Sequence, residues 1–144
     1  MAYADMGKRF AAKLIDIVIG VIIGLPFNLL FGTTKTTSAG VEWKTTNVIP
    51  TLIVVAAWAA YEILLVSTKG ATVGKMALGL RVVNEADGQI PSTGTAALRW
   101  LIQFAGYLVC CIGEFLVWAS PLFDNTKRNQ GWHDKVAKTF VVQA

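Results

Sequence analysis

Four charged side chains lie in or next to the first two apolar runs of the sequence and are its strongest candidates for chemistry. Arg9, Lys13 and Asp16 follow one another at spacings of four and three residues, and Glu62 is the single charge of the second run. A charged side chain at the centre of a membrane-spanning helix costs roughly 2.5–3.5 kcal/mol on insertion, so each one requires a partner or a function. We expect a polar core that either binds a proton, an ion or a substrate, or only holds two helices together.

Glu114 is an isolated acid, flanked by Gly113 and Phe115, with no basic residue within two helical turns. An apolar environment favours the neutral form of a carboxyl group. Glu114 is therefore a candidate proton-binding acid. The alternative is that it lies near water at a helix break or accepts hydrogen bonds from the neighbouring backbone.

Residues that catalyse hydrolysis or bind metals are scarce. His133 is the single histidine, and no nucleophile follows it at a defined spacing. The segment Gly70–Lys75 resembles a phosphate-binding loop, but it is one residue short and Met76 stands where a hydroxyl is required. The adjacent Cys110 and Cys111 lie in an apolar run and are interpreted as small buried hydrophobes. We expect no enzyme activity, no catalytic residue, no metal and no cofactor.

The composition indicates a membrane protein. The chain has 144 residues, of which 54% are hydrophobic and 15% charged, with a mean hydropathy of +0.53. Average soluble domains carry about 25% charged residues. The length fits one domain over residues 1–144. A net charge of +4 is too small to indicate a nucleic-acid partner, and membrane lipids are the expected surroundings.

Two apolar runs, residues 11–32 and 48–67, are long enough to cross a bilayer, which takes about 20 residues. If they form antiparallel helices, Asp16 and Glu62 lie at matching depths. Gly20 and Gly24 continue the helical face of Asp16, and this spacing predicts close packing of the first helix on the second.

A third apolar run, residues 101–123, contains two glycines and Pro121, so it could cross once or enter and return. Lys and Arg accumulate on the cytoplasmic side of short loops. If the run returns, eleven Lys and Arg residues lie on the cytoplasmic side and two on the other side. If it crosses, seven lie on the cytoplasmic side and six on the other. We therefore expect a re-entrant segment in a multi-pass plasma-membrane protein, with a cytoplasmic N-terminus and C-terminus.

Short extended segments predict a small cytoplasmic β-sheet. Residues 80–84 and 139–142 are rich in β-branched residues, and a turn at 87–88 leads to an extended segment at 89–91. Residues 70–80 have the apolar spacing of a short interfacial helix. The expected fold class is an α-helical membrane protein with two full transmembrane helices and a third re-entrant or spanning segment.

Four segments of the chain together resemble the RDD family of small membrane proteins. They are residues 8–16 (KRFAAKLID), 70–83 (GATVGKMALGLRVV), 96–99 (AALR) and 131–142 (GWHDKVAKTFVV). The arginine and the two aspartates that give the family its name fall on Arg9, Asp16 and Asp134. Lys138 departs from the pattern, which has a glycine there, so a different bend is expected before the last strand.

The resemblance implies a membrane domain with a suspected role in transport and no established enzyme activity. We expect a protein that takes part in or assists transport of a small ion or solute; the alternative is a non-transporting accessory or assembly subunit. Two or three segments can hardly enclose a pathway alone, so a homo-oligomer or a larger membrane-protein complex is expected. Asp134 is expected to pair with Arg9 or Arg81.

Overall fold

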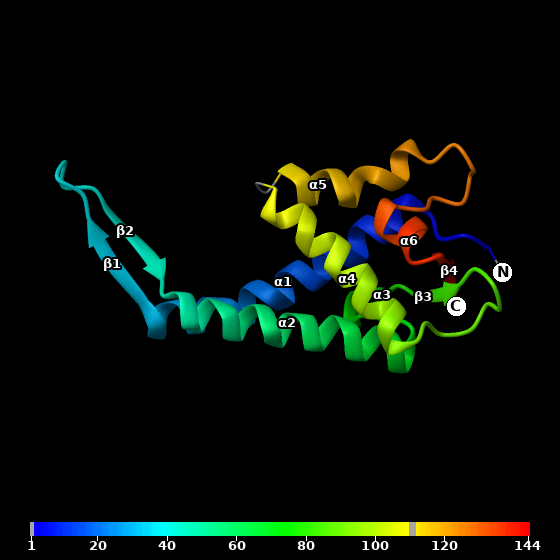
Figure 1. Ribbon diagram of the computed structural model, residues 1–144, viewed down its shortest axis with the longest axis horizontal. Coiled ribbons are helices and arrows are strands. Elements are labelled where there is room, and N and C mark those ends of the chain that lie inside the picture. Colours follow the sequence, from blue (N-terminus) through cyan, green and yellow to red (C-terminus); the bar gives the residue numbers. More distant parts are fainter. Residues whose placement is uncertain (1, 110–111) are drawn as a thin grey trace.

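Two long helices form the arm of the molecule in the computed structural model, which describes residues 2–109 and 112–144 (Figure 1). Helix α1 (Met6–Phe31) runs away from the N-terminus, and helix α2 (Val48–Lys69) returns. Their 26 and 22 residues correspond to roughly 39 and 33 Å, against a hydrocarbon core of about 30 Å. Both predicted spans are therefore helices long and apolar enough to cross a membrane.

Local signals fix the ends of this arm near the chain termini. The Asp5 side chain accepts a hydrogen bond from the Gly7 amide at 2.9 Å and caps the start of α1. Gly70 ends α2 in the left-handed region, with φ at 71°. A Cβ atom at Gly70 would also meet the Arg81 side chain at 2.9 Å, so glycine is required for both reasons.

A β-hairpin occupies the far end of the arm, between the two long helices. Strand β1 (Gly32–Thr36) pairs antiparallel with β2 (Glu42–Thr46) and stands apart from the rest of the molecule (Figure 1). Threonine, common in both strands, favours extended backbone because it is β-branched. The Thr37 amide donates to the Val41 carbonyl oxygen at 2.9 Å and closes the turn.

The third apolar run folds back on itself. Helix α4 (Thr93–Leu108) ends before helix α5 (Ile112–Ala119), and the short helix η1 (Ser120–Phe123) follows. The two helices pack together where Gly106 and Gly113 meet, and a Cβ atom on Gly113 would clash with the Gly106 carbonyl oxygen. This fold-back is the arrangement that a re-entrant segment requires. The turn itself contains Cys110 and Cys111, which lie outside the described residues.

The small sheet has the two predicted strands but a different third segment. Strand β3 (Leu80–Asn84) pairs antiparallel with β4 (Thr139–Gln143), with Val82 opposite Val141. The expected extended segment at 89–91 forms no strand, and proline at position 91 supplies no amide hydrogen for a ladder. Instead, Tyr3 bridges Val142 on the free edge of β4, and the Ala4 amide donates to the Val141 carbonyl oxygen at 2.9 Å.

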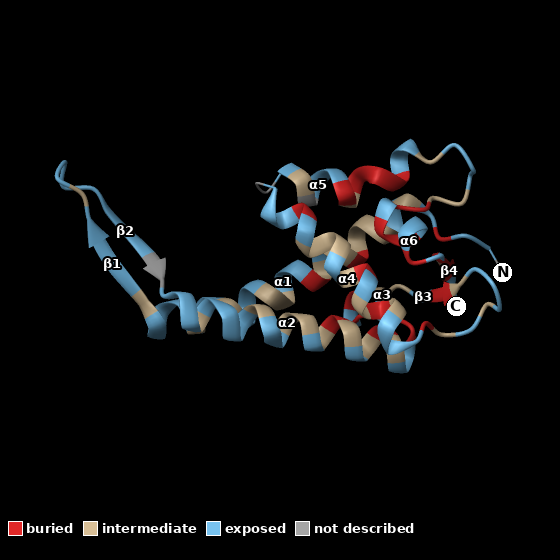
Figure 2. Cartoon of the chain, viewed as in Figure 1, coloured by how far each residue is buried: buried red, intermediate tan, exposed pale blue. Residues whose placement is uncertain are grey.

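Buried residues gather at the end of the molecule that holds both termini, while the arm is exposed (Figure 2). We call this end the polar layer: residues 2–4, α3 (Val73–Ala77), β3, α6 (Trp132–Val136) and β4. The predicted interfacial helix at 70–80 is the shorter α3. The apolar core joins side chains of the polar layer to α1, α2 and α4, and it consists of Ala4, Ala12, Val66, Leu80, Val82, Ala96 and Val141.

Large apolar side chains cover the outside of the arm and of the α4–α5 hairpin. Leu30 is 77% exposed on α1, Val48 is 73% exposed on α2, and Val109 at the hairpin turn is 73% exposed. A soluble monomer seldom exposes so much continuous apolar surface. A lipid environment accounts for this distribution, since these side chains are buried once hydrocarbon surrounds them.

Candidate functional site

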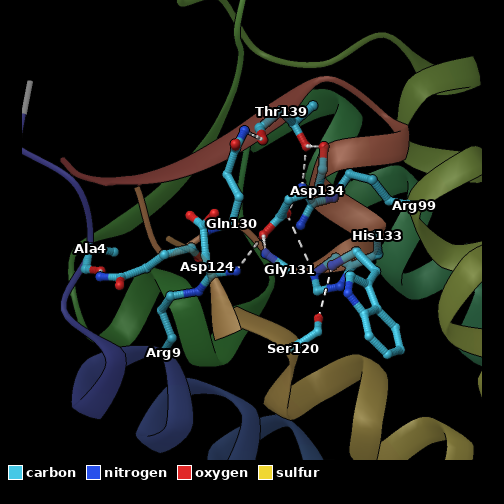
Figure 3. A network of polar contacts seen from close by, with 12 residues as sticks. Ala4, Arg9, Arg99, Ser120, Asp124, Gln130, Gly131, His133, Asp134 and Thr139 are labelled. Carbon is cyan, nitrogen blue, oxygen red and sulfur yellow. Dashed lines mark hydrogen bonds and ion pairs between the residues drawn. The ribbon is translucent and has the colours of Figure 1, made fainter. Parts of the chain in front are cut away.

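Asp134 is the centre of a buried ion-pair network within the polar layer (Figure 3). Its side chain is fully buried, and its Oδ2 atom accepts a hydrogen bond from Arg9 Nη2 at 2.5 Å. Its Oδ1 atom is paired with Arg99 Nη1. The Gly131 amide donates to Oδ2 at 3.2 Å, because Asp134 lies in the first turn of α6. One carboxylate thus joins α1, α4 and α6.

The two arginines of this network are themselves held by other groups. Arg9 also donates to the carbonyl oxygen of Asn129, and Arg99 donates to Thr139 Oγ1 at the start of β4. Gln130 Nε2 donates to the Thr139 carbonyl oxygen at 2.8 Å. Each charged group therefore has several partners, which is the condition under which buried charges are tolerated.

Burial and charge set the protonation states at this centre. Burial alone would raise the pKa of Asp134, but Arg99 and Arg9 hold it well below its ordinary value. Burial lowers the pKa of His133 to about 3, and the two arginines add to this effect against the attraction of Asp134. The His133 ring is therefore neutral at pH 7. Its Nε2 atom lies 3.4 Å from Asp134 Oδ1.

Asp16 has a separate set of partners that fixes α3 against α1. Its carboxylate accepts hydrogen bonds from Thr72 Oγ1 at 2.6 Å, from the Gly74 amide at 2.9 Å and from the Tyr61 hydroxyl at 3.1 Å. A Cβ atom at Gly74 would clash with the carbonyl oxygen of Ala12. The segment that resembles a phosphate-binding loop therefore holds a carboxylate of its own chain.

Glu62 and Lys13 line a cavity between α1, α2, α3, α4 and α6. This cavity, the polar cavity below, has a volume of about 50 Å³, and Lys75, Gln103 and His133 also contribute to its wall. Burial lowers the pKa of Lys75 to about 8, with repulsion by Arg99 adding to the effect. The polar cavity thus contains several charged groups in little space.

A second, larger hollow shares part of this wall. It has a volume of about 280 Å³ and includes Lys13, Glu62 and Gln103. Because these three residues line both hollows, the two adjoin each other. We call the larger hollow the aromatic groove, after the rings that line it: Trp58, Trp100, Phe104 and Tyr107.

The structure divides the expected core of Arg9, Lys13, Asp16 and Glu62 into three environments. Arg9 joins the Asp134 network, Asp16 binds α3, and Lys13 and Glu62 face the polar cavity. Tyr61, next to Glu62, reaches Asp16, so the two acids lie at the same level of the α1–α2 pair, while their depth in a membrane stays a prediction. Of the two expected partners of Asp134, Arg9 is found, whereas Arg81 is exposed and forms no described ion pair with it.

Three other predicted positions have different outcomes. Gly20 lies against the ring of Trp58, which a Cβ atom would meet at 3.1 Å, so it faces α2 at close range. A Cβ atom on Gly24 would meet nothing within 4 Å, and the expected tight packing does not extend that far along α1. The side chain of Glu114 lies outside the described residues, so its predicted role stays a prediction.

Sequence reasoning missed Arg99, Lys75 and Gln103 as members of these sites. A usable signal existed for Arg99, since it is the single charged residue of α4, a helix that the sequence otherwise makes apolar. Lys75 was considered only as part of the segment that resembles a phosphate-binding loop, as part of a family segment, and as one of the positive charges that indicate membrane orientation. Within residues 2–109 and 112–144, no group of three or more His, Cys, Asp and Glu side chains could hold a metal ion.

Comparison with known proteins identifies the family of the chain. The model of the RDD family matches residues 3–138. A protein of Mycobacterium leprae (strain TN) described as a proline-rich antigen is 36% identical over 70 residues, which cover 49% of this chain and 26% of that protein. The match therefore spans about a quarter of that relative's length. No solved structure matches. With nearly its whole length matched and Arg9, Asp16 and Asp134 at the centres of its polar contacts, the chain belongs to the RDD family.

Proposed function

We propose that this RDD-family membrane protein takes part in the transport of a small ion or solute across the plasma membrane. The polar cavity is the observation that supports the proposal. Lys13, Glu62 and Lys75 line it, and none of them forms an ion pair with another described residue. Charged groups below the membrane surface are costly and mark ion or solute pathways in membrane proteins.

The proposal includes a topology. In it, α1 and α2 span the bilayer, and the α4–α5 hairpin enters and leaves on the side of both termini. Lys35 and Lys44 are the only Lys or Arg residues between α1 and α2, so the positive-inside rule places the β1–β2 hairpin outside the cell. Apolar exposure at Leu108 and Ile112 fits a hairpin turn that dips into hydrocarbon.

Two spanning helices and a hairpin cannot surround a pathway. We therefore include a second copy of the chain, or a larger membrane-protein complex, in the proposal. The rival function is an accessory or assembly subunit whose charges only hold helices together. Asp134 and Asp16 each have several polar partners, which favours a purely structural role for these two residues. Their contacts do not account for the polar cavity. In neither case is the protein expected to be an enzyme or to bind nucleic acid.

Reconstitution into liposomes tests the proposal. Gradients of sodium, potassium, chloride and phosphate are imposed one at a time, and flux is compared with protein-free vesicles. We expect flux of at least one ion, reduced about tenfold or more by Lys13→Gln and unchanged by Lys69→Gln, which alters an exposed residue at the end of α2. Absence of flux from folded protein that still copurifies with a partner would support the accessory function instead.

The topology has its own test. A cysteine placed at the exposed Thr126, in a chain whose Cys110 and Cys111 are replaced by alanine, is treated with an impermeant maleimide on intact cells. We expect no labelling until the cells are opened. Labelling from outside would show that residues 101–123 cross the membrane and would end the re-entrant proposal.

A further inference from the structure

The polar cavity contains more positive than negative charge that is free to interact with a ligand. Arg9 is engaged by Asp134, and the His133 ring is neutral. The remaining charged groups of the wall are Lys13, Lys75 and Glu62. Over the described part of the chain, no carboxylate oxygen lies within 4.0 Å of either lysine Nζ atom. Two lysines therefore share one carboxylate, and one positive charge is left uncompensated.

These groups act on one another across the cavity. The charges of Arg99, Glu62, Lys13 and Asp16 all influence the ionisation of Lys75. Arg99 is paired with Asp134, and Asp16 is held by neutral donors outside the cavity wall, so Lys13 and Glu62 are the wall charges within electrostatic reach of Lys75. Glu62 is 8% exposed, so little solvent screens its charge. Gln103, on α4, adds an amide that can donate hydrogen bonds.

We propose that the polar cavity binds a small oxyanion of the phosphate type between Lys13 and Lys75, with the Gln103 amide as a further donor. Ammonium groups and amide hydrogens are the donors that tetrahedral oxyanions accept in proteins. One bound monoanion cancels the excess charge of the wall. The claim that this oxyanion is the transported ion rests on the proposed function. The claim that the cavity binds it does not.

The dimensions of the cavity limit the ligand. Its volume of about 50 Å³ exceeds the roughly 10–15 Å³ that one water needs, so the space suits a single small ion. The adjoining aromatic groove, at about 280 Å³, is lined by α1, α2 and α4 and is large enough for part of an acyl chain. The same phosphate chemistry can therefore come from free phosphate in water or from the headgroup of an anionic lipid.

Glu62 gives the site a feature that separates it from a cation site. A carboxylate in the wall repels a bound oxyanion, so replacing it with glutamine strengthens anion binding. At a cation site the same replacement removes the ligand and weakens binding. The sign of the Glu62→Gln effect therefore identifies the charge of the ligand, and a gain of affinity cannot result from misfolding.

The experiment measures binding to the full-length protein at pH 7 in a neutral detergent. Inorganic phosphate is titrated in one arm by calorimetry. In the other arm, nanodiscs of phosphatidylcholine with or without phosphatidic acid are used, and bound lipid is counted by native mass spectrometry. We expect Lys13→Gln and Lys75→Gln each to weaken binding about tenfold or more. Glu62→Gln should tighten it several-fold, and Lys69→Gln should match the unaltered chain.

Lys→Arg variants at positions 13 and 75 keep the charge and are expected to retain binding if either glutamine variant fails to fold. Saturation by phosphate alone assigns the site to a free anion, and retention of phosphatidic acid alone assigns it to a lipid headgroup. The proposal is overturned if neither probe binds, if the two lysine variants behave as Lys69→Gln does, or if Glu62→Gln weakens binding. Binding that follows these rules without any ion flux would support the oxyanion site and contradict the transport function.

Discussion

The Asp134 network and the polar cavity lie next to each other, and Arg9 and His133 belong to both. In the network, the Asp134 carboxylate pairs with the guanidinium groups of Arg9 and Arg99. Each of the three also forms a hydrogen bond with a further group: the Gly131 amide, the Asn129 carbonyl oxygen and the Thr139 hydroxyl, respectively. In the cavity, Lys13, Glu62 and Lys75 have no such partners among the described residues. Buried charges that satisfy one another hold a fold together, whereas buried charges that do not are available to a ligand.

This contrast gives each region a different expected response to substitution. A satisfied network loses stability when one member is removed, because its former partners stay buried and unpaired. An unsatisfied cavity loses little stability, because its residues form few contacts that a neutral side chain cannot replace. The substitutions and the pH titration below test this contrast.

The largest expected effect comes from Asp134→Asn. It leaves Arg9 and Arg99 buried without a carboxylate and should cost about 3–5 kcal/mol of unfolding free energy. Glu85→Gln is the matched control, because it breaks an ion pair to Arg128 whose side chains are 41% and 43% exposed and should cost less than about 1 kcal/mol. Denaturant unfolding followed by circular dichroism in detergent measures both. Equal effects would contradict a structural role for the network.

Exchanging the charges of Arg9 and Asp134 is not an adequate test of their pairing. An arginine at position 134 would face Arg99 as well as the new acid at position 9. We therefore expect the double exchange to stay destabilised even though the pair is real. A double-mutant cycle with Arg9→Gln and Asp134→Asn measures the pairing without introducing a like charge.

A smaller loss is expected from Gly74→Ala. Its Cβ atom would clash with the Ala12 carbonyl oxygen and push α3 away from Asp16, at a cost of about 1–3 kcal/mol. Gly94→Ala is the control, since the nearest atom to its Cβ is Ser92 Oγ at 3.9 Å. It should leave stability unchanged or raise it slightly. Thermal unfolding compares the two, and equal melting temperatures would show that α3 does not need its close contact with α1.

Acid should destabilise the network gradually. The pKa of His133 lies near 3 in the folded protein and near 6.5 in the unfolded chain, so the unfolded state binds the extra proton first. Stability therefore falls as the pH drops from about 6.5 towards 3, by up to about 1.4 kcal/mol per pH unit from this group. His133→Gln should flatten the decline between pH 6.5 and 5 in melting-temperature profiles. An unchanged slope would mean that His133 is not buried in its neutral form.

The smallest effect on stability is expected in the polar cavity. Lys13→Gln should change the unfolding free energy by less than about 1 kcal/mol, because no described ion pair is lost. The same denaturant experiment measures it beside Asp134→Asn. A loss as large as that of Asp134→Asn would remove the distinction between the two regions.

Patterns local in sequence predicted much of this fold. The two helices long enough to span a membrane follow from long apolar runs, and β3 and β4 from short β-branched segments. The pairing of Arg9 with Asp134, 125 residues apart, came from the family resemblance, because no periodicity connects positions so distant.

Other features depend on contacts that no local pattern records. Arg99 reaches Asp134 because α4 begins at Thr93, whereas the apolar run begins only at 101. Tyr3 and Ala4, rather than residues 89–91, supply the third segment of the sheet, and they do so on the free edge of β4 instead of beside β3. Such choices are settled by tertiary packing, which a single sequence does not display.

Lys138 shows a departure from the family pattern that the backbone accommodates. At the bend before β4, Lys138 adopts the left-handed conformation with φ at 50°. That region favours glycine and costs other residues roughly 1–2 kcal/mol. The bend is thus fixed by its surroundings, in particular by the Glu85 amide, which donates to the Lys138 carbonyl oxygen at 2.9 Å.

The place of β4 in the sheet also sets the order of assembly. It lies between β3 and the N-terminal residues, and Asp134, which pairs with Arg9, comes just before it in the chain. During synthesis the residues of α1 and α2 are made before residues 134–143. Arg9 therefore has no carboxylate partner until Asp134 has been made. Contacts with such long sequence separation form late and slowly. A truncation before residue 134 would therefore leave Arg9 and Arg99 without their carboxylate, whereas a truncation within β4 would keep both ion pairs and remove only the strand.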